Sequence, residues 1–123
     1  MNKKKKILIA DDDKDLLASL AKALSSYDVL LAADGNVAWS AAVFDRPDLV
    51  LLDVEMPGMN GLEVLKKLVG LPHKPVVIMI TGDRSRETAA KAAEIGVFAY
   101  LLKPFEPAEV MEKVKAALAS KAG

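Results

Sequence analysis

The sequence predicts an α/β protein with one doubly wound parallel sheet of five strands. Two observations lead to this fold class. Short apolar segments rich in Val, Ile and Leu alternate along the chain with segments of helical periodicity, which is the pattern of βα units in series. Neither an internal repeat nor a low-complexity linker interrupts the 123 residues. We therefore expect residues 1–123 to form a single domain, with right-handed crossovers that place helices on both faces of the sheet.

The predicted strands are apolar runs bounded by polar or turn-forming residues. Leu49-Val50-Leu51-Leu52 is the clearest of them. A run without polar interruption is typical of a strand that is buried on both faces, as in the centre of a parallel sheet. Strands are predicted at residues 6–10, 28–32, 48–53, 75–80 and 98–102.

The predicted helices have apolar residues at helical spacing and recognisable ends. Asp13 is expected to be the N-cap of the first helix, and Gly96 is expected to end the fourth. Pro107 opens the last helix, because proline is tolerated at the first helical position. The other helices are predicted at about 36–45, 61–69 and 86–95. The predicted core faces contain Leu17, Leu20, Ala21 and Leu24 in the first helix, and Val110, Val114 and Leu118 in the last.

The composition excludes several classes of function. Lys+Arg and Asp+Glu number 17 each, so no net charge favours nucleic acid or an anionic membrane, and neither is expected as a direct partner. The absence of cysteine excludes disulfides and thiolate chemistry. The longest apolar runs are far below the roughly 18 residues of a membrane span, and the run after Lys3–Lys6 is too short for a signal peptide. A cytoplasmic location is therefore expected.

Acidic, hydroxyl and amine side chains stand at the ends of four predicted strands. Because the carboxyl ends of parallel strands share one edge of a sheet, these side chains are expected to meet in the crevice where open α/β proteins bind ligands. Asp53, at the end of the most apolar run, is the best candidate for the residue that carries the function. The full set is Asp11, Asp12 and Asp13 after the first strand, Asp53 after the third, Thr81 after the fourth and Lys103 after the fifth.

This set of side chains is suited to phosphoryl transfer. Neighbouring carboxylates repel one another and raise at least one pKa unless a cation joins them, and Mg²⁺ prefers such oxygen ligands. A lysine ammonium and a threonine hydroxyl would stabilise the equatorial oxygens of a phosphoryl group. The inferred reaction is attack by Asp53 on an activated phosphoryl group, which forms an aspartyl phosphate.

Four segments of the chain resemble the receiver domain of two-component response regulators. The resemblance covers essentially the whole chain. Each segment alone is a weak signal, but the four together, in this order and spacing, are highly specific. The segments are Ile7–Asp13, Leu52–Gly61, Ile80–Gly82 and Tyr100–Phe105.

The resemblance implies a (βα)5 flavodoxin-like receiver fold and a signalling role rather than a dedicated enzyme. Asp53 matches the phosphoacceptor, which takes a phosphoryl group from the phosphohistidine of a sensor histidine kinase or from a phosphotransfer protein. Asp12 matches a direct Mg²⁺ ligand, Asp11 matches an acidic neighbour acting through metal-bound water, and the backbone carbonyl of Glu55 matches a main-chain ligand. Asp53 completes the metal site, and Mn²⁺ is the expected substitute ion.

The resemblance also assigns the residues that would hold the phosphoryl group and respond to it. Thr81 and Lys103 match the hydroxyl and the ammonium that contact the phosphoryl oxygens. Tyr100 matches an aromatic switch, expected to swing inward when Thr81 shifts toward phosphate. The Lys103-Pro104 bond matches a position that is typically cis.

Three further positions lie close in sequence to the matched site residues Asp53 and Thr81. Gly82 stands where a small residue, usually Ala, follows the threonine. Glu55 and Asp83 lie two residues beyond Asp53 and Thr81, at positions whose side chains flank the entry path of hydrolytic water in the family. We predict that the lifetime of the phosphorylated state depends on these two acidic side chains.

The output of such a domain is expected to be a conformational change. The face formed by the fourth helix, fifth strand and fifth helix is the expected contact surface, either for a partner or for a phosphorylation-dependent homodimer. The alanine-rich fourth helix would allow close approach there, or would simply pack tightly on its own sheet. Because the sequence ends at Gly123, just past the last predicted helix, the effector is expected to be a partner protein or an output domain missing from this sequence.

Other functions fit the sequence less well. A phosphohydrolase of the haloacid-dehalogenase type also forms an aspartyl phosphate, but it needs a second Asp where Glu55 stands, and no cap domain is present. A pseudo-receiver would be expected to lack part of the acidic, threonine and lysine set. A nucleotide-binding module is not supported, because neither G-x-G-x-x-G nor a P-loop occurs.

Several conspicuous residues are expected to have structural roles only. Asp13 is expected to cap its helix and not to bind metal. Trp39, with Val43 four residues further on, is expected to pack in the interior. His73, in a predicted loop, is expected to be solvated, as are the lysines of Lys3–Lys6.

Overall fold

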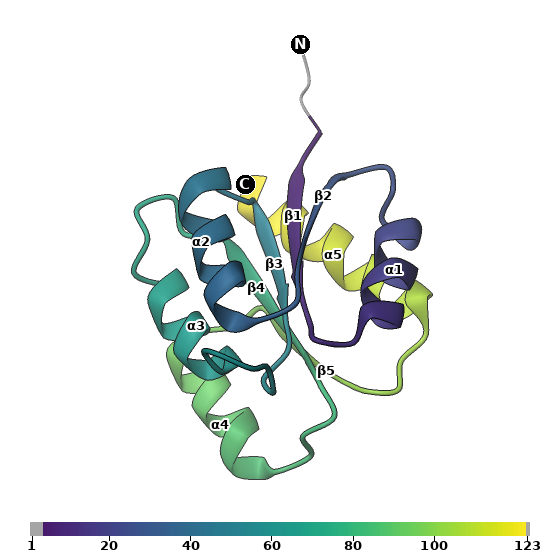
Figure 1. Cartoon of the computed structure of the whole chain (residues 1–123). Helices are drawn as coiled ribbons and strands as arrows, with labels where there is room; N and C mark the ends of the chain where they lie inside the picture. Colours follow the sequence, from purple (N-terminus) through teal and green to yellow (C-terminus); the bar gives the residue numbers. More distant parts are fainter. Residues whose placement is uncertain (1–3, 123) are drawn as a thin grey trace.

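The computed structural model describes residues 4–122, which form five strands and five helices in strict alternation (Figure 1). Lys3 of the lysine-rich flank and Gly123 lie outside the described residues. The strands are β1 (Lys6–Ala10), β2 (Asp28–Ala32), β3 (Leu49–Leu52), β4 (Val76–Thr81) and β5 (Ala99–Leu102). The helices are α1 (Lys14–Ala23), α2 (Gly35–Asp45), α3 (Gly61–Leu68), α4 (Arg86–Ile95) and α5 (Pro107–Ala122).

The strands form one parallel sheet in the order β2-β1-β3-β4-β5, which confirms the predicted fold class. The order places β3 at the centre, and all four of its residues are completely buried. This central position explains why the run Leu49-Val50-Leu51-Leu52 contains no polar residue. β2 pairs with one edge of β1, and β3 pairs with the other. The carboxyl ends of β1 and β3 therefore flank the crevice at which open α/β sheets bind ligands.

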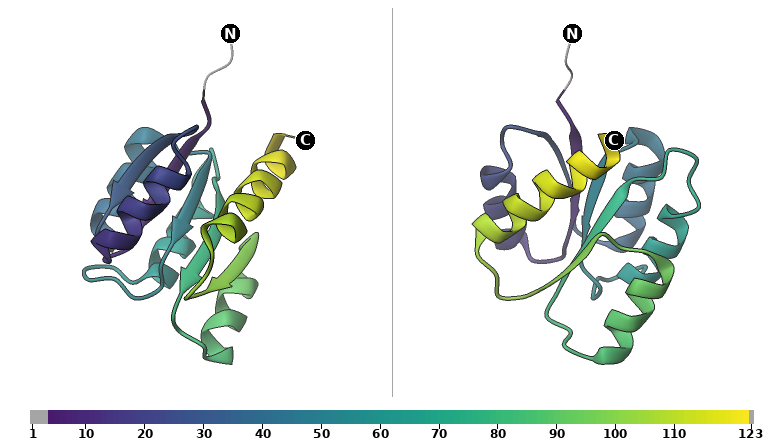
Figure 2. Two further views of the ribbon diagram at one scale, coloured as in Figure 1. Left: turned by 90° about the vertical axis from the view of Figure 1, so that its right-hand side faces the viewer. Right: turned by 180° about the vertical axis from the view of Figure 1, so that it is seen from behind.

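Helices cover both faces of the sheet. Figures 1 and 2 show α2, α3 and α4 on one face and α1 and α5 on the other. Successive strand residues alternate between the two layers: Leu8 of β1 packs in the cluster under α2–α4, whereas Ile7 and Ile9 pack in the cluster under α1 and α5. Both ends of the described chain lie at the edge opposite to the carboxyl ends of the strands (Figure 1).

The predicted element ends differ from the observed ones by only one residue. Thr81, expected just beyond the fourth strand, is the last residue of β4, since it pairs with Leu102 of β5. Asp13 caps α1 as predicted, with its side chain accepting from the backbone N–H groups of Asp15 and Leu16. The predicted core residues of α1 and α5 are buried except for Ala21, which is half-buried.

Three structural expectations have mixed outcomes. Trp39 packs against the α2–α4 core cluster as expected, and the Lys67 ammonium lies 5.4 Å from the centre of its ring. Val43, its expected packing neighbour, is exposed. The expectation of a solvated His73 is wrong for one nitrogen, because Nε2 is covered and has no hydrogen-bond partner among the described residues. In α4 only Ala92 is buried, and Ala90 and Ala93 remain exposed.

No helix within residues 4–122 combines the length and the apolar character that crossing a bilayer requires.

Candidate functional site

Three aspartates gather at the carboxyl ends of β1 and β3. One carboxylate oxygen each from Asp11, Asp12 and Asp53 lies within 4.8 Å of the other two. Sheet pairing creates this cluster: Ala10 of β1 lies opposite Leu52 of β3, and the Asp53 N–H donates to the Ala10 carbonyl over 2.9 Å. Asp11 is completely buried and Asp53 nearly so, whereas Asp12 is exposed to solvent. The cluster is therefore a buried pair of carboxylates with a third at its mouth.

Lys103 brings one positive charge into the cluster. It follows β5, and its backbone N–H donates to the Thr81 carbonyl over 2.8 Å, continuing the pairing of β4 with β5. Its Nζ lies 2.6 Å from Asp11 Oδ2 and 3.3 Å from Asp53 Oδ2. The Lys103-Pro104 bond is cis, as predicted.

Burial and charge act against each other at this site. Burial raises the pKa of Asp53 above its ordinary value, the neighbouring Asp11 raises it further, and Lys103 opposes both. Burial alone would lower the pKa of Lys103, but its hydrogen bond to Asp11 and the charges of Asp53 and Asp11 outweigh this and raise it. Lys103 therefore stays an ammonium. Three carboxylates against one ammonium leave two unmatched negative charges, which fits a divalent cation with oxygen ligands.

Thr81 lies at the same edge of the sheet, on the strand between β3 and β5. It is completely buried, and its Oγ1 accepts the N–H of Asp83 over 3.0 Å. The register pairs Leu52 with Met79, so Thr81, two residues beyond Met79, lies one position past the level of Asp53. The structure thus brings all four strand-end positions named from the sequence to one edge.

The two acidic residues expected beside the water path lie in different environments. The Glu55 side chain is exposed, and its backbone N–H points to Asp53 Oδ1 at 3.4 Å. The Asp83 carboxylate instead accepts from the Ser85 N–H and from the Thr88 hydroxyl, each over 2.8 Å. The hydrogen bond from the Ser85 amide lowers the pKa of Asp83 the most, and the bond from the Thr88 hydroxyl lowers it further. Asp83 is therefore tied to the first turn of α4, a contact the sequence analysis missed.

The network at the start of α4 has a sequence signature that could have been recognised. Ser85 is the N-cap of α4 and accepts the N–H of Thr88 over 3.2 Å. An Asp two residues before a capping Ser can bind the backbone N–H two positions on, as Asp and Asn side chains commonly do in turns. The segment Asp83-Arg84-Ser85 has this spacing.

Tyr100 reaches the same loop from β5. It is half-buried, and its hydroxyl donates to the Asp83 backbone carbonyl over 3.4 Å. Burial raises the pKa of Tyr100, and the charges of Asp83 and Asp53 add to the effect. Asp83 therefore connects Thr81, through its N–H, with Tyr100, through its carbonyl. This is a physical link between the two residues named as a switch pair.

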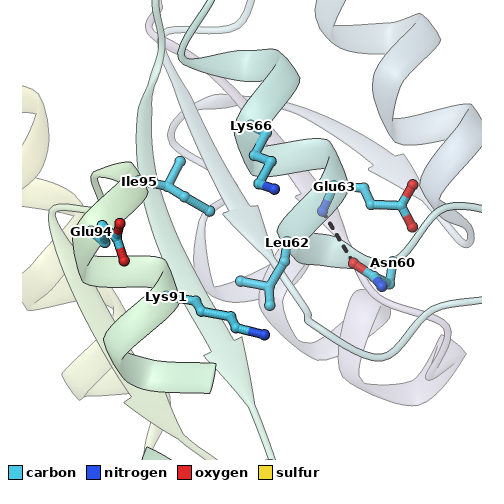
Figure 3. Close-up of a pocket in the computed structure, with 7 residues that line it drawn as sticks. All are labelled: Asn60, Leu62, Glu63, Lys66, Lys91, Glu94 and Ile95. Carbon is cyan, nitrogen blue, oxygen red and sulfur yellow. Dashed lines mark hydrogen bonds between the residues drawn. The ribbon is translucent and has the colours of Figure 1, made fainter. Parts of the chain in front are cut away.

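Two hollows lie near these elements, and only one borders the acidic cluster. A small one, of about 240 Å³, opens beside Lys103 and is lined by Asp13, Leu16, Pro104 and Phe105. A larger groove, of about 550 Å³, lies between α3 and α4 (Figure 3). Its lining contains no predicted site residue: Leu62 and Ile95 supply apolar surface, and the lysines and glutamates of both helices surround them. The lining residues are Asn60, Leu62, Glu63, Lys66, Lys91, Glu94 and Ile95.

Comparison with known proteins identifies relatives over nearly the whole chain. The family model for the response regulator receiver domain matches residues 7–115. The alkaline phosphatase synthesis transcriptional regulatory protein PhoP of Bacillus subtilis is 38% identical over 116 residues, covering 93% of this chain and 48% of PhoP. The transcriptional regulatory protein PrrA of Mycobacterium tuberculosis is 36% identical over 115 residues, 92% of this chain and 49% of PrrA. The chain thus spans about half the length of the curated relatives it matches.

Solved structures give the same result. A CheY-like receiver domain protein from Methanospirillum hungatei superposes with a TM-score of 0.91 at 33% identity, covering 97% of this chain and 98% of that one. The CheX–CheY–BeF₃–Mg²⁺ complex from Borrelia burgdorferi contains a chain with a TM-score of 0.83 at 26% identity, over 91% of this chain and 87% of that one. With the matching family model, the shared fold and an acidic cluster at the expected strand ends, the chain belongs to the response regulator receiver domain family of two-component signalling.

Proposed function

We propose that Asp53 is the phosphoacceptor of this receiver domain, and that it takes its phosphoryl group from a phosphohistidine of a sensor histidine kinase or a phosphotransfer protein. The observation that carries the proposal is the geometry around Asp53. Its buried carboxylate lies beside two further aspartates and 3.3 Å from the Lys103 ammonium, at the ligand-binding edge of the sheet.

A divalent cation is part of the proposal. The side chains of Asp11, Asp12 and Asp53 and the backbone carbonyl of Glu55 would hold Mg²⁺, with Mn²⁺ as a substitute, and Asp11 would act through metal-bound water. Bound there, the ion would neutralise negative charge between the carboxylate and the incoming phosphoryl group. The donor set supports this choice, because all its ligands are oxygens and two negative charges lack a partner. The Borrelia CheY complex, which contains Mg²⁺ and BeF₃, is consistent with such a site.

The transfer step follows from the carboxylate's position. An Asp53 oxygen forms a bond to phosphorus while the P–N bond of the phosphohistidine breaks, and the electron pair of that bond stays on the imidazole nitrogen. An imidazole protonated at its other nitrogen leaves as a neutral group. The donor side chain would approach near the small hollow that borders Lys103 and Pro104.

Lys103 and Thr81 would hold the transferred group. Lys103 already lies within hydrogen-bonding distance of Asp53, so its ammonium would follow the negative charge onto the phosphoryl oxygens. The Thr81 hydroxyl would donate to another phosphoryl oxygen. If the Thr81 hydroxyl turned toward this oxygen, the hydrogen bond that Thr81 Oγ1 accepts from the Asp83 N–H would weaken. Tyr100 would respond through its own hydrogen bond to the Asp83 carbonyl.

The proposed role is signalling, not dedicated catalysis. The chain would assist its own phosphorylation and dephosphorylation, and its output would be a conformational change read by an effector protein or by an output domain. The named relatives are transcriptional regulatory proteins about twice as long as the matched region, which supports an output domain. A location in the cytoplasm, where such kinases phosphorylate their partners, belongs to the same proposal.

Intact-mass measurement tests the proposal. Incubation with Mg²⁺ and a small acyl phosphate is expected to add one phosphoryl group, which base removes. The adduct should be absent in Asp53→Asn and in the presence of a chelator. An adduct of equal yield in Asp53→Asn would overturn the assignment, and rapid turnover of many phosphate esters would favour the hydrolase alternative.

A further inference from the structure

The loop between β3 and α3 carries Glu55, whose carbonyl is the proposed main-chain ligand of the cation. Such a carbonyl can bind a cation well only if the loop holds it in a fixed position. Residues 53–60 lie between β3 and α3, so contacts outside the sheet must hold them. The base of the loop is closed by the Gly61 N–H, which donates to the Val54 carbonyl over 2.7 Å. The outer part of the loop needs a second support.

That support is the first turn of α2. The Gly35 N–H donates to the Pro57 carbonyl over 3.1 Å, across a large separation in sequence. The first N–H groups of a helix have no partner within the helix. In α2 the N-cap side chain of Asp34 takes the Val37 N–H over 2.8 Å, and the β3–α3 loop takes that of Gly35. The loop therefore completes the cap of α2, and α2 fixes the loop.

The contact is so close that only glycine fits at position 35. A Cβ on Gly35 would overlap the Met59 carbonyl oxygen and would lie 2.8 Å from Met59 Cα. These are backbone atoms, so no side-chain rotation relieves the overlap, and the loop itself would have to move. Gly70 provides a contrast, since a Cβ there meets nothing closer than the Lys67 carbonyl at 3.5 Å, an ordinary contact.

We propose that Gly35 is a positioning residue for the cation site. Its close contact with residues 57–59 sets the place of the Glu55 carbonyl and thereby the affinity for Mg²⁺. This inference rests on the proposed function of the acidic cluster, and it adds a residue from a third element, α2, which supplies no ligand itself. Supports behind metal ligands commonly contribute about 10–100-fold to metal affinity.

The first test is the Mg²⁺ affinity of Gly35→Ala, measured by calorimetry. The dissociation constant is expected to rise about tenfold, while phosphorylation by a small acyl phosphate at saturating Mg²⁺ still reaches the wild-type extent. Gly70→Ala should bind Mg²⁺ like the wild type. Val114→Ala, in the core under α5, should lower the melting temperature without changing the affinity, which separates positioning from general destabilisation. Equal affinities of Gly35→Ala and the wild type would overturn the inference.

A second test needs no variant and remains decisive if Gly35→Ala does not fold. Coupling between two sites is reciprocal, so a contact that favours the cation must be favoured by it. Saturating Mg²⁺ is expected to slow exchange of the Gly35 amide hydrogen several-fold and to leave that of Gly70, at the end of α3, unchanged. Unchanged exchange at Gly35 would contradict the inference alone, whereas absence of Mg²⁺ binding by the wild-type protein would overturn the proposed function and the inference together.

Discussion

Asp53 lies where two opposed physical effects meet. The fold buries its carboxylate beside Asp11, which disfavours the charged form, and supplies only Lys103 to compensate. Function requires the charged form, because only an ionised carboxylate attacks phosphorus. Repulsion between the buried carboxylates therefore lowers the stability of the folded state, and a bound cation or a phosphoryl group would relieve it. Such a loss of stability is common at functional sites.

The Asp53→Asn variant should accordingly be more stable than the wild type in Mg²⁺-free buffer at pH 7. The pKa of Asp53 is raised in the folded protein above its ordinary 3.8, so the folded state keeps a proton that the unfolded chain has already released. The carboxylate thus lowers stability as pH rises from 3.8 through its folded pKa. The gain in unfolding free energy should be present at pH 7 and should shrink toward pH 4.

Urea unfolding at both pH values measures this effect. Asp12→Asn is the matched control, because Asp12 is exposed and should yield a smaller gain. A variant Asp53→Asn that is less stable than the wild type at pH 7 would show that the Lys103 contact outweighs the burial of the charge.

Single residues also mark the limit of sequence-based prediction. Asp11, Asp53, Thr81 and Lys103 could be placed together because each ends a recognisable strand, and parallel strands align their ends. The direction of a side chain is not fixed by strand order. The Asp83 carboxylate turns to Ser85 and Thr88, where two donors are close, and strand order alone does not predict this contact.

At the scale of elements, the start of α4 is the part most directly connected to the site. Asp83 joins the Thr81 hydroxyl to the first turn of the helix by two successive contacts. The body of α4 is held less firmly, since Ala92 is its one fully buried residue. A helix with little buried surface and a cap tied to the site is well placed to change when Thr81 moves.

Replacing Asp83 by Ala should loosen the first turn of α4. The amide of Thr88 is expected to exchange several-fold faster with solvent, as measured by NMR, because the cap network loses two of its hydrogen bonds. The pKa of Asp83 is lowered in the folded protein, so its contribution is present above its ordinary value of 3.8 and is lost as pH falls below it. Glu87→Gln, an acidic residue in the same turn, is the control and should leave exchange unchanged.

The lifetime of the phosphorylated state should also depend on the two acidic side chains near the site. The double variant Glu55→Gln/Asp83→Asn is expected to change the dephosphorylation rate, since Glu55 adds negative charge at the mouth and Asp83 shapes the loop after Thr81. The decay of the phosphorylated species, followed by intact mass, measures this rate. A rate equal to that of the wild type would contradict the prediction.

Over the whole molecule, the periodicity of the sequence sufficed to predict the sheet, its helical layers and nearly all element ends. Contacts between segments distant in sequence were not predictable in the same way. The Gly35–Pro57 bond joins the first turn of α2 to the β3–α3 loop, and no local sequence pattern predicts it, because the approach of these two segments depends on the complete fold. The covered Nε2 of His73 has the same origin, because tertiary packing and not loop composition decides its exposure.

The face formed by α4, β5 and α5 carries the expected contact surface of the whole domain. Phe98, directly before the edge strand β5, and Leu102, the last residue of that strand, are 42% and 37% exposed. Phosphorylation with a small acyl phosphate and Mg²⁺ is expected to shift the chain toward a homodimer, as measured by light scattering after size-exclusion chromatography. Phe98→Ser should weaken the dimer about tenfold, the usual scale for an interface aromatic.

Phe44 on α2 is the matched control for that experiment. It is 84% exposed but lies on another face, so Phe44→Ser should leave dimerisation unchanged. Equal loss in both variants would indicate a general effect of surface aromatics, and an unchanged monomer after phosphorylation would contradict the expected dimer.

Chemical localisation of the phosphoryl group tests most directly whether Asp53 is the phosphoacceptor. Borohydride reduces an aspartyl phosphate to homoserine, and the reduced residue can be located by peptide mass spectrometry after phosphorylation in the presence of Mg²⁺. We expect homoserine at position 53 and at neither Asp11 nor Asp12, although one oxygen of each carboxylate lies within 4.8 Å of the other two. Homoserine at Asp11 or Asp12, or a phosphorylated protein that yields none, would contradict this assignment.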